Sequence, residues 1–175
     1  VTGAAAGSLL VASRGFMRRP QDVQESLDLY EGGEAVESAC LKLAIERATD
    51  EEIARARAYL ADTRQLPPDT TPERLVELDE GFHLQIADMA RNQELRRMLV
   101  TLNERIRFIR WIDMERIGRS ATQKEHLQIL KALQARDAAA AQRELGEHIG
   151  RRRDQIVEAI TKGLARIYLP ADAQG

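Results

Sequence analysis

Hydrophobic side chains recur every three or four residues along most of the chain, between Val23 and Tyr168. This spacing places them on one face of an α-helix, and interruptions in it separate six amphipathic segments. The connections are short, which favours antiparallel packing, so the sequence predicts an all-α fold, an antiparallel bundle of about six helices. The expected helices cover residues 23–47, 50 to about 65, 72 to about 92, about 95 to a break at 118, from there to about 133, and 138–168.

Local signals support several of these boundaries. Thr49 and Glu52 have the spacing of a capping box, which starts the second helix, and Pro67-Pro68 is expected to stop it. Thr71-Pro72 puts a proline in the first turn of the third helix. The pair Gly32-Gly33 lies inside the first helix, where it predicts a break or kink.

Composition narrows the class of protein. Hydrophobic residues make up 43% of the chain and aromatic residues only 4%, which suits one helical domain. We expect a linker or remnant at 1–22, the domain at 23–168 and a frayed tail at 169–175. No apolar run approaches the length of a membrane span, so a cytoplasmic protein without membrane contact is expected. The net charge of −2 argues against DNA binding by this segment alone.

The candidate chemistry lies on three of the predicted helices. Asp79 and His83 are four residues apart, so they share one face of the third helix. His126 precedes Leu130 by one turn, and His148 follows the apolar stripe of the last helix. All three histidines of the chain are therefore expected to face the core.

Three imidazoles and one carboxylate suit a divalent transition metal, most of all zinc, with nickel, iron and manganese as alternatives. Such a set leaves coordination positions open to water or to a ligand carboxylate. The alternative for each histidine taken singly is a core side chain with a satisfied hydrogen bond. The metalloprotease signature is absent, because no histidine stands four positions after His126, so no enzyme activity is expected.

Among the arginines, only Arg105 is a candidate for effector binding. Arg105 continues the helical line of Met98 and Leu102, which predicts a guanidinium directed into the bundle as an effector clamp. The alternative is an ion pair with a neighbouring helix or a side chain that reaches out to solvent. The run 151–153 consists of three arginines that point to different sides of a helix, which favours a solvated surface.

Four segments of the chain resemble the C-terminal effector-binding domain, of the FCD type, in the FadR subfamily of GntR-family transcription regulators. They are EGGEAVESACLKLAIERATDEEI, LDEGFHLQIADMARNQEL, KEHLQILKALQARDAAAA and EHI. The resemblance implies that Asp79, His83, His126 and His148 bind a metal at the bundle centre. It also implies a homodimer, a small organic acid as effector, and operator DNA bound through an N-terminal winged helix-turn-helix. No such module is recognisable before Val23, so the chain is expected to be a fragment or a regulator that lacks its DNA-binding module.

One position departs from the family pattern. The family often has an arginine in the first helix where this chain has Gly33, and that arginine resembles a clamp for the effector's carboxylate. The leading hypothesis is still a sensor in which a metabolite beside the metal changes helix packing and thereby DNA binding. The alternatives are a metal-dependent enzyme and a structural dimerisation module stapled by the metal.

Overall fold

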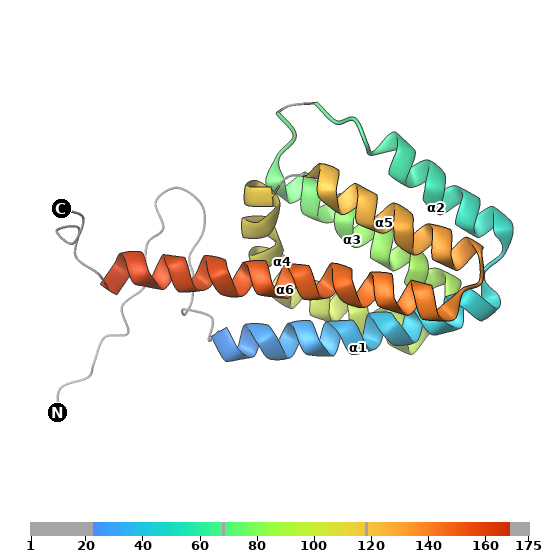
Figure 1. Cartoon of the computed structure of the whole chain (residues 1–175), viewed down its shortest axis with the longest axis horizontal. Helices are drawn as coiled ribbons and strands as arrows, with labels where there is room; N and C mark the ends of the chain where they lie inside the picture. Colours follow the sequence, from blue (N-terminus) through green and yellow to red (C-terminus); the bar gives the residue numbers. More distant parts are fainter. Residues whose placement is uncertain (1–22, 68, 118, 169–175) are drawn as a thin grey trace.

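The computed structural model describes residues 23–168 except 68 and 118, and these residues form six α-helices without a β-strand. The all-α prediction is therefore confirmed. Figure 1 shows the helices lying alongside one another as an elongated bundle. They are α1 (Val23–Arg47), α2 (Asp50–Asp62), α3 (Pro72–Met89), α4 (Gln93–Ile117), α5 (Arg119–Gln134) and α6 (Ala138–Tyr168).

The long helices α1 and α6 run antiparallel and form one side of the bundle (Figure 1). Helix α4 packs against both α1 and α3, while α5 packs against α6 and α2. One large hydrophobic core joins all six helices, with fully buried side chains such as Leu41, Ile53, Phe82, Leu130 and Leu145 at its centre. Helix α3 is thus enclosed by its neighbours, which is why polar groups on its inner face are removed from water.

The predicted caps are confirmed. Thr49 Oγ1 accepts a hydrogen bond from the backbone N–H of Glu52, and the Glu52 carboxylate accepts one from the N–H of Thr49 at 2.8 Å. Thr71 likewise caps α3 through its side-chain oxygen, with Pro72 in the first turn. These bonds satisfy backbone donors that a helix start leaves open, so the two helices begin where the sequence indicates.

Three boundary predictions were wrong. Helix α1 continues through Gly32-Gly33 without a break, because packing against α4 and α6 outweighs the low helix propensity of glycine. Helix α2 ends at Asp62 rather than near residue 65, since Thr63 already caps it with its N–H bonded to the carbonyl of Tyr59. Helix α3 ends at Met89 rather than near residue 92, because Arg91 adopts a left-handed backbone with φ of 50°.

The expected linker at 1–22 and tail at 169–175 lie outside the described residues. Among the helices that are described, none combines the length and the apolar character needed to cross a bilayer.

Candidate metal centre

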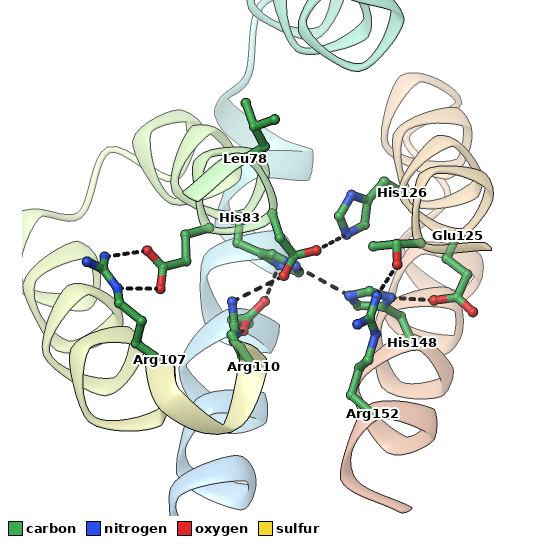
Figure 2. Close-up of polar contacts among 12 residues, drawn as sticks. Leu78, His83, Arg107, Arg110, Glu125, His126, His148 and Arg152 are labelled. Carbon is green, nitrogen blue, oxygen red and sulfur yellow. Dashed lines mark hydrogen bonds and ion pairs between the residues drawn. The ribbon is translucent and has the colours of Figure 1, made fainter. Parts of the chain in front are cut away.

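Asp79, His83, His126 and His148 converge at the centre of the bundle, and all four side chains are buried. One potential ligand atom of each lies within 4.8 Å of those of the other three. Asp79 and His83 come from consecutive turns of α3, His126 from α5 and His148 from α6 (Figure 2). The expectation that every histidine faces the core is confirmed.

The distances within this cluster leave several polar atoms without a hydrogen-bond partner. His126 Nε2 is 3.5 Å from Asp79 Oδ1, and neither atom makes a hydrogen bond. His148 Nε2 faces His83 Nε2 at 3.3 Å. Leaving buried polar groups unpaired costs about 1–3 kcal/mol each, so such groups are normally satisfied. A cation held between a carboxylate and imidazole nitrogens would satisfy them, so the cluster fits a divalent metal ion.

Two glutamates lie on the far side of the histidine rings. Glu125 Oε2 accepts a hydrogen bond from His148 Nδ1 at 2.7 Å, and Arg151 Nε donates to the other oxygen of Glu125 at 2.9 Å. Glu37 Oε2 lies 2.5 Å from His83 Nδ1, so each of these two rings has a carboxylate at its Nδ1. Carboxylates at Nδ1 direct the lone pair of Nε2 toward the cluster centre, which is the usual support of a metal-binding histidine.

The electrostatics of the cluster favour ligand-competent forms of its groups. Burial lowers the pKa of His126 and of His148; the hydrogen bond to Glu125 opposes this at His148 without reversing it, so the neutral form of both imidazoles is favoured. Burial alone would raise the pKa of Asp79, but His126 and Arg152 outweigh it and lower that pKa. Neutral imidazoles and an ionised carboxylate are the forms that bind a metal.

A narrow cavity adjoins the cluster, and the centre of a water-sized sphere can occupy about 20 Å³ of it. Asp79, His83 and His148 form one part of its wall, and Arg110 of α4 and Arg152 of α6 contribute positive charge. The Arg110 side chain is only 11% exposed and lies 3.4 Å from Asp79 Oδ2 and 3.7 Å from Glu37 Oε1. Arg152 is also buried and donates a hydrogen bond to Thr122 Oγ1.

The expected inward direction of Arg105 was wrong. Its side chain is 53% exposed and forms an ion pair with Glu25 at 3.1 Å. The line of Met98 and Arg105 lies on the outer side of α4, where Met98 is 52% exposed, whereas Leu99, Ile106 and Arg110 point inward. Arg110 therefore occupies the position in the cavity that we expected for Arg105.

Other residues of the site were missed at the level of sequence. Arg151 and Arg153 are half exposed as expected, but Arg152 between them lines the cavity. Its signal was its spacing of four residues from His148. Glu37 carried a similar signal, because it precedes buried Cys40 by one turn of α1. Charged residues in helical phase with buried neighbours were thus the overlooked indicator.

Comparison with known protein families places this geometry in context. The family model of the FCD domain matches residues 28–151, which include all four cluster residues. The chain belongs to the FCD family. The resemblance found in the sequence motifs is thereby confirmed.

Relatives of this FCD domain carry regulatory names. The "Nta operon transcriptional regulator" of Aminobacter aminovorans is 34% identical over 157 residues, which is 90% of this chain and 73% of that protein. The "Uncharacterized HTH-type transcriptional regulator YdhC" of Bacillus subtilis (strain 168) is 23% identical over 145 residues, 82% of this chain and 63% of that protein.

Solved structures show the same fold. A GntR family transcriptional regulator from Pseudomonas syringae pv. tomato aligns with a TM-score of 0.71 at 22% identity, over 90% of this chain and 66% of that one. McbR/YncC of E. coli aligns with a TM-score of 0.67 at 15% identity, over 86% of this chain and 76% of that one. The FCD domain thus has the all-α architecture found in GntR-type regulators.

Proposed function

We propose that this FCD domain is the sensor of a transcription regulator and binds a small organic acid beside a metal ion. The observation that carries the proposal is the juxtaposition of four converging ligand atoms with a cavity containing Arg110. The regulatory name of the relative with 34% identity supports a sensor rather than an enzyme or a purely structural module. The cavity beside the cluster also favours a sensor over a purely structural metal site, which needs no cavity.

Asp79, His83, His126 and His148 would hold the metal, and zinc is the ion we propose for this nitrogen-rich set. A bound metal would offer open coordination positions to the ligand's carboxylate. Other residues of the chain would orient the metal ligands and bind the acid. Glu37 and Glu125 fix the orientation of two imidazoles, and Arg110 presents a guanidinium suited to two hydrogen bonds with a carboxylate.

The cavity also suggests how ligand binding reaches other parts of a regulator. Its wall contains Leu29, Tyr30 and Gly33 of α1, together with residues of α3, α4 and α6. A ligand that contacts several helices favours one packing arrangement over another by the difference in its affinity for the two. We propose that this shift controls operator binding by an N-terminal winged helix-turn-helix of the whole regulator.

Calorimetric titration of small carboxylates into the metal-loaded chain tests this function. We expect at least one acid to bind, and we expect its affinity to fall at least tenfold after the metal is removed with a chelator, because its carboxylate loses its strongest partner. Binding that is unchanged by metal removal would contradict a ligand site that includes the metal. The absence of binding by any acid would contradict the proposed sensor itself.

We further propose that the chain forms a homodimer, since two DNA-binding domains must contact the two half-sites of an operator. Sedimentation equilibrium at micromolar concentration is expected to give twice the chain mass of 19.7 kDa. A mass of one chain under the same conditions would show that the domain does not carry the dimer interface.

A further inference from the structure

Glu34 is an acidic residue of the cavity wall that no described group neutralises. It lies on α1, is half-buried, and lines the same cavity as the metal cluster and Arg110. Its Oε1 faces α6, where a Cβ added to Gly146 would lie 3.6 Å away. Within the described ranges it forms neither a hydrogen bond nor an ion pair.

The other acidic side chains around the site all have partners. Glu37 contacts His83 and Arg110, Glu80 forms an ion pair with Arg107 at 2.6 Å, and Glu125 bonds to His148 and Arg151. Figure 2 shows the Arg107 and Glu125 pairs on either side of the cluster. Glu34 is therefore the carboxylate of the cavity wall that is open to interact with a bound molecule.

Gly33 precedes Glu34 on α1. Gly33 is buried and lines the cavity, and a Cβ added there would meet no atom within 4 Å. The cavity wall thus combines the negative charge of Glu34 on α1 with the positive charges of Arg110 on α4 and Arg152 on α6. A molecule that matches both sides carries opposite charges at its two ends.

We propose that Glu34 is a specificity-determining residue that selects an organic acid bearing an ammonium group, that is, an aminocarboxylate. The inference rests on the proposed function, because it assumes that the carboxylate end lies beside the metal and Arg110. Glu34 then accepts hydrogen bonds from the ammonium group. A dicarboxylate is disfavoured, because its second carboxylate meets the like charge of Glu34.

The test compares acids that differ only in the amino group, titrated calorimetrically into the metal-loaded chain. The pairs are glycine with acetate, β-alanine with propanoate, and 4-aminobutanoate with butanoate, and malonate and succinate represent dicarboxylates. We expect at least one aminocarboxylate to bind at least tenfold more tightly than its partner without the amino group. Glu34→Gln should reduce this ratio to near one and leave the affinity for the partner acid within threefold.

Two further variants separate charge recognition from a structural effect. Glu34→Lys should reverse the preference and make a dicarboxylate bind at least tenfold more tightly than the aminocarboxylate. Glu31→Gln, at an exposed site on the same helix, should change neither affinity. Equal affinity for the two members of every pair, or a ratio that survives Glu34→Gln, overturns the role of Glu34 while the sensor function stands. If no acid of any class binds, both proposals are refuted.

Discussion

Replacing His83 with alanine is expected to reduce bound metal from one ion per chain to a small fraction and to lower the melting temperature. The substitution removes one of four converging ligands from α3. Metal that binds only the folded chain stabilises it by about 4 kcal/mol at a thousandfold excess over its dissociation constant. For a domain of this size, that corresponds to a fall of about 8–16 °C. Elemental analysis and thermal unfolding with and without chelator would measure both effects.

The control for this experiment is Gln85→Ala, because Gln85 lies two residues along the same helix and bonds to the carbonyl of Gly81 in its own helix. It should retain metal and a chelator-sensitive melting temperature. The His83→Ala protein should instead melt at the same temperature whether or not chelator is present. A wild-type chain whose stability does not respond to chelator, or a variant that keeps its full metal content, would rule out the proposed centre.

Replacing Arg110 with alanine is expected to weaken binding of the organic acid at least tenfold. The Arg110 guanidinium is almost fully buried at the cavity beside the cluster. Charge-assisted hydrogen bonds of this kind contribute about 1.5–3 kcal/mol, and tenfold in affinity corresponds to about 1.4 kcal/mol. Calorimetric titration of the metal-saturated variant measures the loss of affinity for the acid. Elemental analysis of the same sample shows whether the metal is still bound, so the two effects can be separated.

Arg105→Ala provides a matched control, since it removes the same side chain from the same helix at an exposed position paired with Glu25. Its affinity for the acid should equal that of the unmodified chain. If Arg105→Ala rather than Arg110→Ala weakens binding, the clamp is on the outer face of α4 and the cavity is not the ligand site. Arg110→Lys keeps the positive charge but loses the planar guanidinium. Its affinity for the acid is expected to lie between those of the Arg110→Ala and Arg105→Ala chains.

Helix starts were predictable from sequence because local contacts determine them. Thr49 and Thr71 bond to backbone groups three residues away, so no knowledge of the rest of the fold is needed. Helix α4 shows the opposite case. Its sequence contains two apolar lines, through Met98 and through Leu99, and only packing against α1 and α3 decides that the second faces inward.

The histidines of the site were predictable from sequence, whereas two charged residues beside them were not. His83, His126 and His148 could be placed because each follows the period of its own helix's apolar stripe, so their shared burial follows from three local patterns. Glu37 and Arg110 were not placed from sequence, although Glu37 is in helical phase with buried Cys40, because charged residues usually mark the solvated face of a helix. Their burial is understood only once α1 and α4 are known to enclose α3, where Arg110 forms ion pairs with Glu37 and with Asp79.

In the proposed sensor, Glu37 would couple metal binding to ligand binding. One of its oxygens contacts His83 of the metal cluster and the other lies 3.7 Å from Arg110, so a single carboxylate joins the metal site to the ligand clamp. Reciprocity of linked binding requires that a ligand made tighter by the metal also makes the metal bind tighter, by the same factor. A shortage of either one would then weaken the binding of the other, so the domain would respond to the supply of both molecules.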